Sequence, residues 1–255
     1  LNEGKTIKSN EIWEGSPAEL IKTKSISELQ LPLETKKIKK LVYYIIFSLL
    51  LFIFPFALLT PLLPVLILIT ELDNNANDYD FSYFIYMPLL SLIYIVLFSI
   101  QTIILTRLLQ QNIKSGKYPI YSFTFLRKWL SDQLISLSLL VLHQIFATVY
   151  ISTLFRLLGA KIGKYTEIST ANNVSHTFLE IGSNSFIADN VTLGETDVRG
   201  QQLIIENTLI GSNSFVGNSA LISQGYVLND DMLIGVLSLP PNLSLIHISE
   251  PTRPY

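Results

Sequence analysis

The sequence has no cysteine, only three histidines and few charged residues. Lys and Arg number 18 and Asp and Glu 20 among 255 residues, so charged residues make up 15% and the formal net charge is −2. The absence of Cys excludes a disulfide framework, a thiolate metal site and a Cys nucleophile. A net charge near zero leaves no electrostatic footprint for nucleic acid. Because no Gly-rich phosphate loop, metal-ligand cluster or nucleophile elbow occurs, no metal is expected.

Two long uncharged runs, 41–70 and 81–106, supply much of the 49% hydrophobic content. Each is longer than the roughly 20 apolar residues that cross a bilayer core of about 30 Å. The loop between them, 71–80, is acidic and has no Lys or Arg, whereas basic residues flank the pair. The positive-inside rule then predicts a transmembrane helical hairpin over 41–110 with cytoplasmic flanks. An integral membrane protein, with the lipid bilayer as a partner, is the expectation.

A third uncharged run, 133–155, is more polar and contains His143. Basic residues stand on both sides of it, which favours both ends on the same side of the membrane. We therefore expect residues 111–158 to form interfacial or re-entrant helices, with a third crossing as the alternative. His143 is either a membrane-buried polar group with a role or an interfacial His facing water.

An aliphatic residue recurs at every sixth position in the last third of the chain. The series consist of Ile162, Ile168 and Val174, then Ile181, Ile187 and Leu193, then Ile204, Ile210, Val216, Ile222, Leu228 and Ile234. A period of six is neither helical nor that of a single strand, so it requires a repeat architecture. It is typical of hexapeptide repeats, and predicts an all-β left-handed parallel β-helix of about four coils over 159–242. Such domains commonly assemble as trimers, so a homo-oligomer is a further expectation.

Both ends of the chain depart from this organisation. The chain starts at Leu1, which suggests an internal fragment, and residues 1–20 contain Gly15-Ser16-Pro17-Ala18. A similar motif closes many hexapeptide β-helices, so residues 1–20 are predicted to be the tail of a preceding β-helix domain. The alternative is a simple turn in a linker. Residues 21–40 are predicted to form a basic linker. Residues 243–255 break the six-residue phase and resemble a translated sequencing adapter, or else form an amphipathic tail.

Several motifs together resemble the membrane-bound C-terminal region of non-ribosomal-peptide-synthetase-like proteins of the poly-lysine-synthetase type. They are Gly116–Pro119 with Arg127–Leu130, Gly159–Gly163, Phe186–Asn190, Ile210–Ala220 and Leu233–Ser238. The resemblance implies alternating transmembrane pairs and hexapeptide domains, with adenylation and carrier domains upstream as partners. It also implies that an acyl thioester on a phosphopantetheine carrier reaches this region, which needs no cofactor of its own.

Hexapeptide acyltransferases generally use a His as general base, and His176 is the candidate here. It lies where the repeat spacing lengthens to seven, so we expect it on an exposed bulge beside the coil. Asp189 is the candidate to orient its imidazole, and Asn190 and Asn218 are candidates for substrate binding. The alternatives are a loop His without a role, a solvent-facing turn Asp, and an Asn218 that only occupies a left-handed turn.

Two functions follow as hypotheses. The first is a membrane-tethered, acyltransferase-like module that forms amides or esters from carrier-bound aminoacyl groups at the cytoplasmic face. The second is a non-catalytic scaffold or oligomerisation domain of a membrane-bound synthetase. A convergent polar cleft around His176 favours the first, whereas a His176 isolated in water favours the second. A transporter is disfavoured because the two apolar runs contain no charge.

Overall fold

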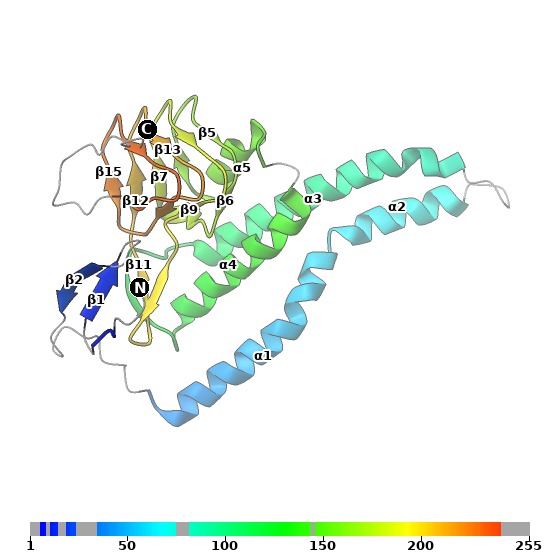
Figure 1. Cartoon of the computed structure of the whole chain (residues 1–255). Helices are drawn as coiled ribbons and strands as arrows, with labels where there is room; N and C mark the ends of the chain where they lie inside the picture. The colour runs from blue at the N-terminus through cyan, green and yellow to red at the C-terminus, as the bar shows by residue number, and fades with distance from the viewer. Residues whose placement is uncertain are drawn as a thin grey trace.

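A long helical arm projects from a strand-rich body (Figure 1). The computed structural model describes residues 6–8, 11–14, 19–23, 35–74, 82–143 and 146–240. The predicted closing motif at 15–18, most of the acidic loop and the tail at 243–255 lie outside these residues. The helices are α1 (Lys37–Leu59), α2 (Leu62–Asn74), η2 (Ser82–Tyr86), α3 (Met87–Gln110), α4 (Phe123–Leu142), α5 (Tyr150–Leu158) and η4 (His176–Phe178).

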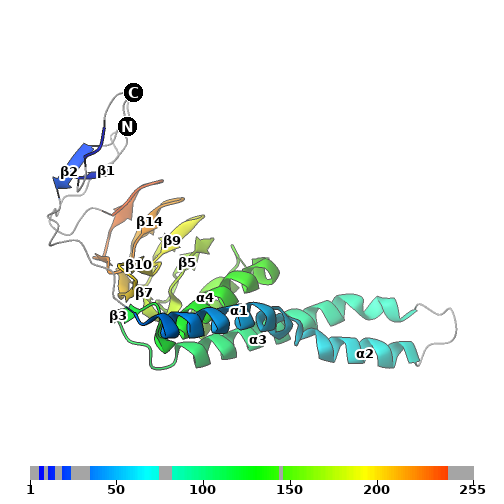
Figure 2. The ribbon, with the colours of Figure 1, turned by 90° about the horizontal axis from the view of Figure 1, so that it is seen from below.

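The arm consists of α1, α2, η2 and α3, and it contains the two long apolar runs. Helix α1 continues through Pro55 and ends just before Pro61, because a proline lacks the N–H that continues a helix and restricts the residue before it. Thr60 at this break donates a hydrogen bond of 2.7 Å to Gln101 of α3. Within the described residues the expected two-helix hairpin contains a break, so that α2 continues outward from α1 and α3 returns alongside α2 (Figures 1 and 2).

Among the residues that the structure describes, two helices are long and apolar enough to cross a membrane, as judged by length and composition: Lys37–Phe56 and Phe84–Gln110. Several large apolar side chains of the first, such as Phe52 at 74% exposure, are largely uncovered by protein. Helix α3, by contrast, packs one polar stripe against α4, where Thr102 and Ser138 share a hydrogen bond of 3.0 Å. These exposed apolar faces favour association with a membrane.

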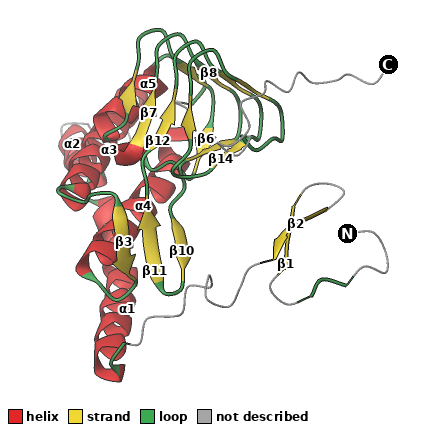
Figure 3. Cartoon of the chain, turned by 90° about the vertical axis from the view of Figure 1, so that its left-hand side faces the viewer, coloured by secondary structure: helices red, strands yellow, loops and turns green. Residues whose placement is uncertain are grey.

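The strands of the body form three parallel sheets and one antiparallel sheet (Figure 3). The parallel sheets have the orders β15-β12-β7-β4, β16-β13-β8-β5 and β14-β9-β6; the antiparallel sheet is β10-β11-β3, and β1 pairs with β2 separately. The strands are β1 (Glu11–Glu14), β2 (Glu19–Thr23), β3 (Gly116–Pro119), β4 (Lys161–Ile162), β5 (Glu167–Ile168), β6 (Ala171–Asn172), β7 (Leu179–Ile181), β8 (Phe186–Ile187), β9 (Val191–Leu193), β10 (Asp197–Arg199), β11 (Gln202–Ile205), β12 (Thr208–Ile210), β13 (Phe215–Val216), β14 (Leu221–Ile222), β15 (Val227–Leu228) and β16 (Leu233–Ile234).

Most residues of the six-residue series end these short strands and are buried. Ile162, Ile181, Ile210 and Leu228 occupy equivalent positions in one sheet, through direct parallel pairing. The apolar face of α5 closes one end of this core, where Ile151, Leu154, Phe155 and Leu158 are all buried. Burial of such side chains stabilises the body by roughly 1.5–3 kcal/mol each.

The prediction of an all-β left-handed parallel β-helix is wrong for this structure. Among the described residues the strands make separate parallel sheets, none of them closed or wound into a solenoid, and helices are interspersed with them. Ile204 also leaves the predicted series, because β11 turns away to pair with β10 and β3. Its neighbours Leu203 and Ile205 are buried instead, against Ile113 and Phe178. A period-two strand thus interrupts the period of six.

Candidate functional site

A cavity of about 380 Å³ opens between α4 and the first layers of the body. Its walls come from segments far apart in the sequence. The lining residues are Lys128, Asp132, Ile135, Ser136 and Leu139 of α4, with Phe146, Phe155, Ala171–His176, Glu195 and Thr196. The volume is within the range of small-molecule sites, and the walls combine apolar and charged groups as such sites do.

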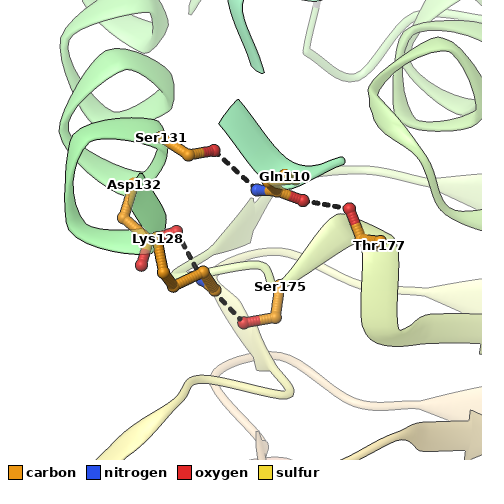
Figure 4. Close-up of polar contacts among 6 residues, drawn as sticks. All are labelled: Gln110, Lys128, Ser131, Asp132, Ser175 and Thr177. Carbon is orange, nitrogen blue, oxygen red and sulfur yellow. Dashed lines mark hydrogen bonds and ion pairs between the residues drawn. The ribbon is translucent and has the colours of Figure 1, made fainter. Parts of the chain in front are cut away.

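Lys128 and Asp132 lie on the face of α4 that borders this cavity. Ser122 caps the helix by accepting a hydrogen bond of 3.2 Å from the Phe125 N–H, and the spacing of four places both charges on one face. Lys128 is 1% exposed. Its Nζ donates to Asp132 Oδ1 at 2.5 Å and approaches Ser175 Oγ at 3.5 Å (Figure 4). A buried ammonium needs such a partner, because losing it leaves an uncompensated charge.

The carboxyl group of Asp132 sits in an environment that disfavours its charge. Its pKa is raised, chiefly because the surrounding protein desolvates it although 38% of the side chain is exposed. The Lys128 ammonium opposes this effect, and the nearby Glu195 carboxylate adds to it. The ionised form of Asp132 is therefore destabilised, and an additional positive charge in the cavity would stabilise it.

His176 lies in the cavity wall at the start of η4 and is 2% exposed. The edge of its ring meets Phe155, with centroids 4.5 Å apart and planes at 86°. Burial, and secondarily the charge of Lys128, lower its pKa to about 3, with the Val174 backbone opposing slightly. Neither ring nitrogen makes a hydrogen bond of normal geometry within the described residues. His176 is thus a buried, neutral imidazole in the cavity wall.

Gln110, the last residue of α3, ties the arm to this site. Its side-chain amide donates to Ser131 Oγ of α4 at 2.6 Å, and its oxygen accepts a hydrogen bond from Thr177 beside His176 (Figure 4). Gln110 and Ser131 are both buried. Because buried polar groups are costly when left unpaired, this chain of contacts sets the position of η4 relative to α3 and α4.

The structure separates the other predicted site residues from His176. Asp189 accepts hydrogen bonds from Ser169 and Thr170, and its N–H donates to Asn218 at 3.2 Å. Asp189, Asn190 and Asn218 do not line the cavity, and Asp189 does not orient the imidazole.

Asn190 has one indirect link to the cavity, through a hydrogen bond from Asn172, which lines it. It has the left-handed conformation expected of a turn Asn, with φ of 58°. Asn218 does not, because the left-handed residue is its neighbour Ser219, with φ of 56°. The prediction that His176 lies on an exposed bulge is wrong. The side chain is buried, because α4 and Phe155 lie against it.

Sequence reasoning missed Lys128 and Asp132 as site residues. The available signal was their spacing of four ahead of an uncharged run. Glu195 belongs to the segment 194–200, which lengthens the repeat spacing between Leu193 and Ile204, and the structure places it at the cavity. Within the described residues no cluster of three or more His, Cys, Asp or Glu side chains could hold a metal ion.

The structure combines apolar helices that favour membrane association with a strand-rich body whose cavity is lined by both charged and apolar residues. No family model matches the chain, and no solved structure matches it. The chain is similar to the delta-poly-L-ornithine synthetase of Acinetobacter baumannii (strain AB307-0294), with 37% identity over 247 residues. The match covers 92% of this chain and 18% of that protein, so the chain spans less than a fifth of its relative. It is therefore related to a poly-amino-acid synthetase.

Proposed function

We propose that this chain is the membrane-associated region of a poly-amino-acid synthetase, in which the cavity at His176 transfers aminoacyl groups. The relationship to a poly-ornithine synthetase supports a role in polymer formation. The observation that carries acyl transfer is the buried His176, which lines a cavity together with a buried lysine and whose ring nitrogens have no hydrogen-bond partner of normal geometry within the described residues. A pure scaffold has no use for such a group, because burying it unpaired costs about 1–3 kcal/mol.

In the proposed step an amine attacks the carbonyl carbon of an aminoacyl thioester. His176 accepts the proton that the amine nitrogen loses as the carbon–nitrogen bond forms, because the imidazole is neutral above about pH 3. The ammonium of Lys128 stabilises the negative charge that develops on the carbonyl oxygen. The carbon–sulfur bond then breaks, and the leaving thiolate takes the proton back from His176. This developing negative charge also raises the basicity of the imidazole during the reaction.

The donor thioester is proposed to come from a phosphopantetheine carrier domain of the same protein, and the acceptor from the growing polymer or a free amino acid. The body would then work on the cytoplasmic side of the membrane, where carrier-bound substrates are made. The runner-up function is a scaffold for the synthetase, without chemistry of its own.

The test uses the full-length synthetase in membranes, supplied with ATP and radiolabelled ornithine, the monomer that names the relative. His176→Ala is expected to lower polymer formation at least 100-fold, the smallest contribution usual for a general base. His143→Ala removes an exposed His at the end of α4 and should leave the rate unchanged. Full polymer formation by the His176 variant would exclude the catalytic role and favour the scaffold.

A further inference from the structure

The charges around the cavity do not balance. One ammonium, that of Lys128, faces two carboxylates, those of Asp132 and Glu195, while His176 is neutral. Lys128 is already committed to Asp132 at 2.5 Å. Glu195 lies exposed at the rim and has no ion pair within the described residues, yet it is close enough to influence Asp132. The cavity therefore carries one excess negative charge, which a positively charged ligand group would neutralise.

A second observation, independent of the carboxylates, indicates that this cavity receives a ligand. His176 is buried in its wall with neither ring nitrogen paired within the described residues. Buried polar atoms without partners are rare in folded proteins, and a catalytic role or a bound water, ion or ligand is among the explanations for them. The ligand thus has a polar group at the His176 end.

Part of the cavity wall is aliphatic and aromatic. Ile135 and Leu139 come from α4, and Phe146 from the segment that follows it. Such walls accept a short methylene chain, whose burial contributes about 0.8 kcal/mol per CH₂. A volume of about 380 Å³ suits a molecule of amino-acid size.

We propose that Asp132 and Glu195 form a recognition site for the primary ammonium group of an aliphatic amino acid, whose other polar end reaches His176. As a binding site it stands on the cavity alone; its use as the subsite for the acceptor or donor side chain rests on the proposed function. The ammonium sits between Glu195 and the outer oxygen of Asp132, and the carbonyl end lies beside Ser175 and Lys128.

The binding test uses the full chain in lipid nanodiscs and isothermal titration with 5-aminopentanamide. This probe has a primary ammonium, a four-carbon chain and a neutral amide; 5-hydroxypentanamide is its uncharged counterpart. We expect the ammonium probe to bind at least tenfold more tightly than the hydroxyl probe. Equal affinities would overturn the proposal, because they would show that the cavity does not read the charge.

Glu195→Gln is the decisive variant, because Glu195 is exposed and its side chain makes no hydrogen bond or ion pair within the described residues. It should weaken binding of the ammonium probe about three- to tenfold, as expected for one partly solvated charge pair. The matched control is Glu167→Gln, an exposed carboxylate on β5 outside the cavity, which should bind as the wild type does. Unchanged binding in Glu195→Gln would contradict the assignment.

The two proposals fail in different ways. Glu195→Gln should weaken binding of the ammonium probe, whereas His176→Ala should lower kcat in the polymerisation assay. If the ammonium probe is not preferred but His176→Ala abolishes polymer formation, only the recognition site is overturned. If the ammonium probe is preferred but His176→Ala keeps full polymer formation, only acyl transfer is overturned. Competition by a lysine decamer distinguishes the sources: displacement of the probe assigns the site to the polymer, and no displacement assigns it to the free amino acid.

Discussion

At the scale of single residues, the site depends on an imidazole and an ammonium that are both buried. The ammonium of Lys128 donates to Asp132 at 2.5 Å, and its charge helps to keep His176 neutral. The ammonium of Lys128 therefore lies near a neutral imidazole, that of His176, which can accept a proton. Such opposed environments for neighbouring titratable groups are common where acid–base chemistry occurs.

The burial of His176 makes the stability of the fold depend on pH. Its pKa is about 3 in the folded chain and about 6.5 when unfolded, so below pH 6.5 the unfolded chain binds a proton that the native chain does not. Stability should therefore fall as the pH drops from 6.5 towards 3, by about 3 kcal/mol at pH 4.

Thermal unfolding of the full chain in detergent at pH 7 and pH 4 measures this loss. His176→Asn should lose markedly less stability than the wild type, whereas the exposed His143→Asn should behave as the wild type does. Asp132 has a raised pKa and so acts in the opposite direction, losing stability as the pH rises, but it is present in all three proteins and cancels in the comparison. Parallel pH profiles would contradict the assignment of a neutral, buried His176.

At the scale of elements, the parallel sheets stack strands so closely that some turns admit only glycine. A Cβ on Gly211 would lie 2.4 Å from the backbone of Asn229 and Asp230, and one on Gly182 would lie 2.4 Å from the backbone N of Ser212. Gly235 follows Ile234 just as Gly211 follows Ile210, but its nearest obstacle is a side-chain oxygen, Ser238 Oγ, at 3.0 Å. Equivalent positions in the six-residue pattern thus differ in what stands next to them.

This difference predicts unequal effects for the same substitution. Gly211→Ala should destabilise the body by about 3 kcal/mol or more, because backbone must move, whereas Gly235→Ala should cost less than about 1 kcal/mol. Comparing the melting temperatures of the two variants with the wild type measures both effects. Similar losses would show that the inner stacking at Gly211 is looser than the structure has it.

At the scale of the whole molecule, the arm and the body meet at the site. Helix α3 leaves an exposed apolar segment, enters the body at Gln110 and contacts η4 through Thr177 (Figure 4). Arg107 of the same helix donates to the Leu157 carbonyl at 2.7 Å and to that of Arg156 at 3.1 Å, at the end of α5. Any membrane that held α1 and α3 would therefore hold the cavity at a set distance from its surface.

The absence of Cys allows the predicted orientation to be tested with single introduced cysteines. Glu180→Cys places a thiol on the body, and Asn77→Cys places one in the acidic loop. A membrane-impermeant maleimide should label Asn77→Cys in intact cells and Glu180→Cys only after lysis, because the positive-inside rule puts the basic flanks in the cytoplasm. The Glu180 change removes only an exposed ion pair with Lys161, which contributes little. The reverse labelling pattern would place the body outside.

The sequence by itself determined which residues are apolar and at what local period. Because side-chain period and hydrophobic run length are properties of neighbouring residues, they predicted the long apolar helices and the burial of residues such as Ile181 and Ile210. They also singled out His176. They misjudged Ile204, because β11 pairs with β3, more than 80 positions earlier in the chain.

Only the tertiary structure decided what surrounds His176 and how the strands combine. The cavity brings together α4, the segment 171–176 and the insertion at Glu195, and Gln110 reaches Thr177 across 67 positions. No local pattern specifies such distant contacts, because they depend on how whole elements pack. The burial that lowers the pKa of His176, and the separate sheets that replace the expected coil, are consequences of that packing.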